Sequence, residues 1–154
     1  MDKKIALRAE NLTFSYDKKT IVVHQQNLSL YQGETVILTG PNGSGKTTLL
    51  GIIMDILKAS SGSYNWNGQQ STNEVRKKIG TLLETPNFYH YMNAEDNLLI
   101  AARIKGRGEG DIEKVLRIVN LYERRKSKFS TYSLGMKQRL AIASTLLGDP
   151  DILV

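Results

Sequence analysis

The sequence contains no cysteine, 3 prolines and a single tryptophan among its 154 residues. Without cysteine the chain can form neither a disulfide nor a thiolate metal site. Few prolines beside 13 glycines, with 40% hydrophobic and 23% charged residues, are typical of a globular protein and argue against a disordered or fibrous one. At this length we expect one domain with a hydrophobic core of its own.

Long hydrophobic runs are missing as well. The longest apolar stretch covers residues 98–102, or 49–54 if a glycine is counted, whereas a membrane-spanning helix needs ~20 apolar residues. The first five residues, Met-Asp-Lys-Lys-Ile, lead into alternating polar and apolar positions and include no hydrophobic segment of a secretory signal. We therefore expect no direct membrane insertion and a cytoplasmic protein.

Charge is unbalanced toward the basic side. Lysine and arginine number 21 against 15 acidic residues, a formal net charge of +6. Such a charge permits an anionic partner, which could be a nucleotide, a nucleic acid or an acidic membrane surface. Charge alone does not choose among them.

Hydrophobic periodicity predicts strands in the first half of the chain and helices in the second. Before residue 84, apolar residues alternate with polar ones, form one short continuous run and recur once with helical spacing. These patterns indicate a mixed α/β core. After it, Asn93, Asp111 and Ser133 are each predicted to cap a helix. The predicted strands are 5–16 with a break at 10–11, 21–31, 35–39, 63–66 before an Asn-Gly turn, 79–83 and 152–154, and the predicted helices include 46–57 and a short one ending at 78.

One glycine-rich segment carries specific chemistry. Residues 40–47 match the P-loop pattern G-x-x-x-x-G-K-[ST], after an apolar run and at the start of a predicted helix. Such glycines let successive backbone N–H groups point inward at a helix N-terminus, which suits a triphosphate. Lys46 would contact the β- and γ-phosphates, and the Thr47 hydroxyl would bind Mg²⁺. The predicted nucleotide-binding residues here are Gly40, Pro41, Asn42, Gly43, Ser44, Gly45, Lys46, Thr47 and Thr48. The alternative is an ordinary glycine-rich turn.

Two further segments resemble those of ABC transporter ATPase subunits. Residues 13–16, Thr-Phe-Ser-Tyr, resemble the aromatic segment that stacks on adenine, with Tyr16 in the stacking place; otherwise Tyr16 simply ends a strand. Residues 132–139 resemble the signature segment L-S-G-G-Q, with Leu134 and Met136 as departures. The resemblance implies that Ser133 and Gly135 face the γ-phosphate of an opposite subunit. Without it, Ser133 is only a good helix cap.

Residues around Glu84 occupy the place of the family's Q-loop. Glutamate stands where glutamine is usual, so an ionised side chain here accepts hydrogen bonds without donating any, beside the expected metal. Glu84 is accordingly a candidate catalytic and Mg²⁺ residue, with a surface glutamate of no role as the alternative. Residues 146–154 resemble the approach to the Walker B strand, whose carboxylates would follow next. We therefore expect the chain of 154 residues to bind MgATP but to hydrolyse it poorly.

Together these features resemble the bacitracin-type and lantibiotic-type peptide export and immunity branch of the family. The resemblance implies an α/β P-loop NTPase core with an N-terminal antiparallel β-rich part and a mostly helical insertion, divided as 1–85, 86–147 and 148–154. It also implies ATP and Mg²⁺ as cofactors, and a transmembrane permease and a second ATP-binding subunit as partners. The location would be the inner face of the cell membrane, and no nucleic acid would be bound.

Two rival functions and one further surface stay open. A nucleic-acid-associated ABC-type ATPase would suit the basic charge, and a small P-loop kinase would share the P-loop but not the signature segment. The aromatic residues Phe88, Tyr89 and Tyr91 lie where the family's insertion meets the transmembrane partner. They suit either such a contact or a buried core.

Overall fold

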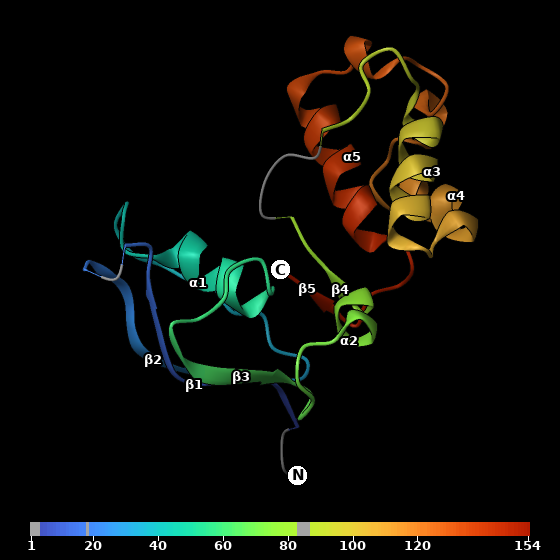
Figure 1. Cartoon of the computed structure of the whole chain (residues 1–154). Helices are drawn as coiled ribbons and strands as arrows, with labels where there is room; N and C mark the ends of the chain where they lie inside the picture. Colours follow the sequence, from blue (N-terminus) through green and yellow to red (C-terminus); the bar gives the residue numbers. More distant parts are fainter. Residues whose placement is uncertain (1–3, 18, 83–86) are drawn as a thin grey trace. The chain divides into compact units, whose positions relative to one another are not determined.

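The computed structural model describes residues 4–17, 19–82 and 87–154. They belong to two compact units, Met1–Arg76 and Lys77–Val154, each with buried hydrophobic residues of its own (Figure 1). Glu84, predicted to be a catalytic and metal-binding residue, lies outside the described residues.

The first unit is built on a three-stranded antiparallel sheet. Its strands β1 (Ile5–Ser15), β2 (Ile21–Tyr31) and β3 (Ser61–Trp66) lie in the order β2-β1-β3 (Figure 1). The predicted break in the first strand is confirmed. The register shifts between Ala9 and Leu12, and Asn11 has a φ of 51°, which marks a β-bulge. The antiparallel N-terminal part expected from the sequence is therefore present.

Helix α1 (Lys46–Ile53) packs its apolar side against this sheet. Leu49, Ile52 and Ile53 are buried, and the indole Nε1 of Trp66 in β3 donates a hydrogen bond of 2.9 Å to the carbonyl of Ile53. The predicted helix was longer, to residue 57. It ends earlier because the backbone N–H groups of residues 56 and 57 both donate to the carbonyl of Gly51, which turns the chain away from the helix axis.

The prediction of a central strand at 35–39 is wrong for this structure. The segment forms no ladder with any described strand, and its apolar side chains are exposed, Ile37 to 81%. A strand needs hydrogen-bonded neighbours as well as an apolar sequence. The run of Val36, Ile37 and Leu38 satisfies only the second condition.

The Asn-Gly turn after β3 is confirmed. Asn67 and Gly68 have φ angles of 49° and 76°, and the Gln69 amide donates to the Trp66 carbonyl at 2.8 Å. The chain then forms the short helix α2 (Asn73–Lys77), at whose start the Thr72 hydroxyl accepts from the Val75 amide. The short helix predicted to end at residue 78 is thus present.

A polar network around Asp55 joins these elements. Its carboxylate accepts hydrogen bonds from the hydroxyl of Tyr64 in β3 at 3.0 Å and from Ser71 at 3.4 Å, and it pairs with Arg76. Burial, aided by the Asp55 carboxylate, raises the pKa of Tyr64 to about 12. The phenol therefore stays protonated as a donor to Asp55 through the physiological range.

The second unit combines three main helices with a two-stranded parallel pair. The strands β4 (Ile79–Gly80) and β5 (Ile152–Leu153) are short versions of the strands predicted there. Among the described residues, no helix has the length and apolar character needed to span a bilayer. The helices are α3 (Ala94–Lys105), α4 (Ile112–Ile118) and α5 (Leu134–Leu146), with 3₁₀ turns η1 (Glu109–Asp111), η2 (Tyr122–Arg124) and η3 (Phe129–Thr131).

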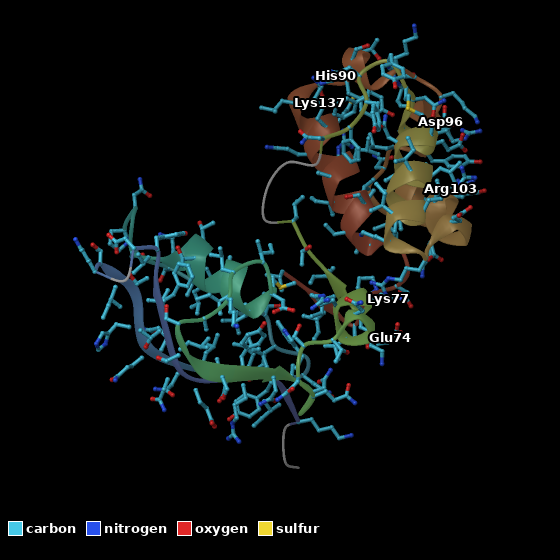
Figure 2. The ribbon with its side chains drawn as sticks, in the orientation of Figure 1. Glu74, Lys77, His90, Asp96, Arg103 and Lys137 are labelled. Carbon is cyan, nitrogen blue, oxygen red and sulfur yellow. The ribbon has the colours of Figure 1, made fainter. Side chains whose placement is uncertain are left out.

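Two of the three predicted helix caps are confirmed. The side chains of Asn93 and Ser133 accept hydrogen bonds from backbone amides in the first turns of α3 and α5. The prediction that the Asp111 side chain caps α4 is wrong. Its carboxylate instead accepts a hydrogen bond of 3.0 Å from the Gly148 amide, beyond the end of α5. Figure 2 shows Asp96 near the start of α3 and Arg103 near its end, the charge order that the helix dipole favours.

Candidate nucleotide-binding site

The predicted phosphate loop has a defined backbone conformation in the first unit. The Ser44 amide donates to the Pro41 carbonyl at 3.2 Å, and the Leu49 amide donates to the Gly45 carbonyl at 2.8 Å as α1 begins. Gly43 and Gly45 have φ angles of 81° and 89°. A Cβ atom on Gly45 would lie 2.8 Å from the Val22 carbonyl in β2, so both φ and space require glycine there.

The Lys46 side chain folds back over this loop. Its Nζ donates to the carbonyl oxygens of Gly40 and Pro41, both at 2.8 Å, and lies 3.5 Å from the Ser44 hydroxyl. The ammonium is thus held where the loop's backbone surrounds it. Carbonyl oxygens are weaker partners for an ammonium than phosphate oxygens, whose charge assists the bond. An entering phosphate can therefore compete with these carbonyls for the same cation.

Tyr16 and the start of α1 are in contact. The Tyr16 hydroxyl and the Thr48 hydroxyl lie 3.3 Å apart, and the Tyr16 ring meets Phe14 edge-on with centroids 4.8 Å apart. Tyr16 is 68% exposed, whereas Thr48 is buried. An aromatic ring fixed at its hydroxyl end and open over its surface can stack on a planar base. The structure thus brings Tyr16 together with the P-loop helix.

The residues of the loop fit a polyphosphate with a hard cation. Helix α1 carries no acidic residue in its first turn, so the positive end of its dipole is not offset there. The Thr47 side chain is exposed beside Lys46. In the described part of the chain, no group of three or more His, Asp or Glu side chains could hold a metal. The Thr47 hydroxyl, with phosphate oxygens and water, is a donor set of the kind that Mg²⁺ prefers, and its metal contact stays a prediction.

Ser133 and Gly135 lie at the start of α5 in the second unit. The Ser133 hydroxyl accepts from the Met136 amide at 3.3 Å, so the capping role is real. No atom lies within 4 Å of where a Cβ on Gly135 would stand, and the Leu134 side chain is exposed. The first turn of α5 has no acidic residue. This open, positively polarised helix start leaves room for an anion, and its phosphate contact stays a prediction.

A glycine loop at the start of a helix, with a lysine folded into it, defines the nucleotide-binding site of a P-loop protein. Residues 23–154 match the family model described as ABC transporter. The chain therefore belongs to the ABC transporter family, and its α/β fold is that of the family's ATP-binding domains.

Two relatives fall within the resemblance found in the sequence. The chain is 34% identical to the bacitracin transport ATP-binding protein BcrA of Enterococcus faecalis, over 100% of this chain and 51% of the relative. It is 35% identical to the lantibiotic transport ATP-binding protein SrtF of Streptococcus pyogenes, over 96% of this chain and 64% of the relative. The chain thus spans about half to two thirds of the length of these relatives.

Solved structures agree in fold. The ATP-binding subunit of an ABC transporter matches with a TM-score of 0.81 and 28% identity, over 96% of this chain and 64% of that one. The cbiO1 protein of Clostridium perfringens, described as part of the ABC transporter complex cbiONQ, matches with a TM-score of 0.83 and 25% identity, over 98% and 64%. The fold class predicted from the sequence is confirmed.

Proposed function

We propose that this chain is the MgATP-binding part of an ABC transporter subunit that powers export of a peptide or drug-like compound. The observation that carries the proposal is the P-loop at the start of α1, with the Lys46 ammonium already inside it. The family match and the bacitracin and lantibiotic relatives support the transport role and the class of substrate.

Each loop residue has a proposed part in binding. The amides of residues 43–48 donate to phosphate oxygens, and Lys46 exchanges the carbonyls of Gly40 and Pro41 for the β- and γ-phosphates. Thr47 orients Mg²⁺, which supplies charge neutralisation when bound. Tyr16 covers one face of the adenine, and the Thr48 hydroxyl holds the ring at its hydroxyl end. We propose the loop residues Gly40, Pro41, Asn42, Gly43, Ser44 and Gly45 as the remaining contacts.

The partners follow from the same proposal. A second ATP-binding subunit would complete the site, with Ser133 and Gly135 facing the γ-phosphate held by the opposite chain. Closure of the two subunits around MgATP would drive a transmembrane permease. Glu84 would act beside Mg²⁺ as the counterpart of the family's glutamine. The proposed functional division is 1–85 for nucleotide binding, 86–147 for the signature, and 148–154 for the approach to Walker B. The complex would lie at the inner face of the membrane.

The nucleic-acid and kinase alternatives have less support. Residues 23–154 match one family of transport proteins, and both relatives are named for transport of antibiotic peptides. The signature segment at the start of α5 has no place in a small kinase. A net charge of +6 is the one feature that favours nucleic acid.

Replacing Tyr16 by alanine should weaken MgATP binding about 10-fold, because a base stacked on an aromatic ring gains ~1–3 kcal/mol. Tyr16→Phe keeps the ring and loses only the contact with Thr48, so its affinity should stay within about 3-fold of the parent. Calorimetric titration with MgATP measures both. If Tyr16→Ala and Tyr16→Phe bound equally well, the ring would have no stacking role.

The transport role predicts that a polytopic membrane protein is encoded beside the gene of this chain, and it is tested by co-expression of the two. We expect the two to purify together from detergent extracts at an equal molar ratio. A matched control is an unrelated polytopic protein of similar size and expression. Recovery equal to that control, with MgATP binding intact, would contradict the transporter assignment and leave the nucleotide site standing.

A further inference from the structure

Two loops of the second unit lie side by side at the start of α3. The Phe129 amide donates to the Met92 carbonyl at 2.9 Å, and the Ser130 amide donates to the His90 carbonyl at 3.0 Å. The Lys137 ammonium of α5 lies 5.3 Å from the centroid of the Phe129 ring, and Figure 2 shows His90 and Lys137 at this end of the unit. We call it the basic end, after the side chains that it carries, which are Tyr91, Arg124, Arg125, Lys126, Lys128 and Lys137.

Cations are dense at the basic end. Residues 124–128 read Arg-Arg-Lys-Ser-Lys, so four of these five side chains carry a positive charge. Glu95 pairs with Lys126 and lies 3.6 Å from the Arg125 guanidinium. Three further cations form no ion pair with any carboxylate of the described residues, namely Arg124, Lys128 and Lys137. The basic end therefore has positive charge that the fold does not neutralise.

The fold fixes the backbone of this loop and leaves its charges in solvent. The Tyr132 hydroxyl donates to the Arg124 carbonyl, and the Thr131 hydroxyl donates to the Lys128 carbonyl, both at 2.7 Å. Tyr132 is buried, whereas Arg124 and Lys128 are exposed. Like charges held on one short loop repel each other, and an anionic surface brought against them removes this repulsion.

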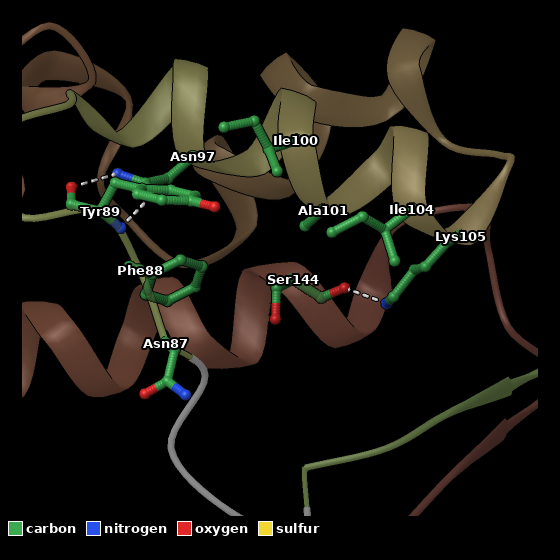
Figure 3. A pocket seen from close by; sticks show the side chains of 9 residues that line it. All are labelled: Asn87, Phe88, Tyr89, Asn97, Ile100, Ala101, Ile104, Lys105 and Ser144. Atoms are coloured by element: carbon green, nitrogen blue, oxygen red, sulfur yellow. Dashed lines mark hydrogen bonds between the residues drawn. The ribbon is translucent and has the colours of Figure 1, made fainter.

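An exposed aromatic residue lies beside these cations. Tyr91 is 71% exposed, and its ring meets that of Tyr89 edge-on with centroids 5.8 Å apart. The Asn97 side chain fixes the loop of both tyrosines, because it accepts from the Tyr89 amide at 2.7 Å and donates to the Tyr89 carbonyl at 3.1 Å (Figure 3). A ring with an apolar body and a polar tip, next to lysine and arginine, suits the headgroup layer of a bilayer.

Lipid headgroups fit this surface better than a nucleic acid does. Residues 124–128 include no asparagine or glutamine that could bond the edge of a base, and their charges lie on long side chains. A bilayer offers many anionic phosphates in one plane, which several separate cations can meet at once. The cytoplasmic leaflet of a membrane carries such anionic lipids.

We propose that the basic end binds anionic lipid headgroups of the membrane surface, with Arg124, Lys128 and Lys137 on lipid phosphates and the Tyr91 ring in the headgroup layer. The proposal rests on the proposed function for the nearness of a membrane. The contact is peripheral, and its attraction falls off within a Debye length, ~10 Å in 0.1 M salt. It attaches the second unit to the bilayer by a surface of its own, with the start of α3 toward the lipid.

The test measures co-sedimentation of the whole chain with lipid vesicles. We expect binding to vesicles of phosphatidylcholine with about one third phosphatidylglycerol, and no binding to phosphatidylcholine alone. The double variant Arg124→Gln/Lys128→Gln should bind the anionic vesicles about 25-fold more weakly, since each cation near the surface contributes about fivefold. Tyr91→Ala should bind them about 3-fold more weakly, because the ring no longer enters the headgroup layer.

The matched control is the double variant Arg103→Gln/Lys114→Gln, which removes one arginine and one lysine from the same unit. Arg103 lies in the last turn of α3, away from the basic end (Figure 2), and Lys114 lies 3.5 Å from Asp149, beyond the end of α5. Both control residues are exposed, so their loss should change stability little. This control should bind anionic vesicles within about 2-fold of the parent.

Four results would overturn this assignment. They are equal binding to the two kinds of vesicle, no vesicle binding at all, equal affinities in the two double variants, and binding of random-sequence RNA or DNA by a chain that leaves anionic vesicles free. The last result would assign the basic end to nucleic acid. Binding of Tyr91→Ala at the parent's affinity would remove the ring from the contact.

MgATP titration of the parent chain separates this proposal from the proposed function. A chain that binds anionic vesicles but not MgATP would contradict the proposed function and leave the lipid contact standing. A chain that binds MgATP but no vesicles would contradict the lipid contact alone.

Discussion

Lys46→Ala is expected to weaken MgATP binding about 100-fold or more. The lysine is the one cation held inside the loop, and a hydrogen bond to a charged group contributes ~1.5–3 kcal/mol before a second phosphate contact is counted. The ammonium bonds to the exposed loop carbonyls of Gly40 and Pro41 and to the Ser44 hydroxyl. Its removal should therefore change the unfolding midpoint little while it removes most of the affinity. Titration calorimetry with MgATP measures the loss.

The matched control for this variant is Lys58→Ala, which removes an exposed lysine of the same unit that lies beyond the end of α1. Its affinity for MgATP should equal that of the parent, because Lys58 lies outside the loop of residues 40–47. Both variants lower the net charge by one, so the comparison separates the loop contact from the charge. Equal affinities for Lys46→Ala and Lys58→Ala would show that the loop does not bind phosphate through its lysine.

Trp66→Ala is expected to lower the free energy of unfolding of the first unit by about 3–5 kcal/mol. The side chain is 2% exposed, and its N–H bonds the last carbonyl of α1. Alanine would leave a cavity and an unsatisfied carbonyl at the end of the P-loop helix. Urea unfolding followed by far-ultraviolet circular dichroism measures the change, since fluorescence is lost with the only tryptophan.

One further variant separates the contributions of the Trp66 ring and its N–H group, and a second variant at another position is the control. Trp66→Phe keeps most of the apolar contact and loses the N–H donor to Ile53, so about 1–2 kcal/mol should be lost. Tyr91→Ala, at a residue 71% exposed in the second unit, should change stability by no more than about 0.5 kcal/mol. A Trp66→Ala chain as stable as Tyr91→Ala would mean that β3 does not support α1.

Local rules predicted much of the fold. The bulge in β1, the Asn-Gly turn and the caps Asn93 and Ser133 each depend on a few adjacent residues, and the structure confirms them. The P-loop is equally local, because its glycines and Lys46 act within eight residues. The fold class followed from the same signals together with the family resemblance.

Features that depend on distant residues could not be read in this way. The run 35–39 has a strand's composition but pairs with no strand in the described part of the chain, and Asp111 has a cap's residue type but accepts from the Gly148 amide. The sequence places Tyr16 near the P-loop only by resemblance, and it gives no sign of the Thr48 contact. The role of Trp66 was also missed, although a lone tryptophan just before an Asn-Gly turn is a signal for a packed hairpin end. A pocket of about 300 Å³ on the second unit is lined by residues 87–89, by residues of α3 and by Ser144 of α5, so no single stretch of the sequence encodes it.

A crystal structure of the chain with Mg²⁺ and a non-hydrolysable ATP analogue tests the proposed nucleotide site most directly. The proposal expects the triphosphate inside the loop of residues 40–47, with the Lys46 ammonium moved from the carbonyls of Gly40 and Pro41 onto phosphate oxygens. An intact fold with Lys46 still bonded to those carbonyls, and the analogue absent from the loop or bound elsewhere, would contradict it.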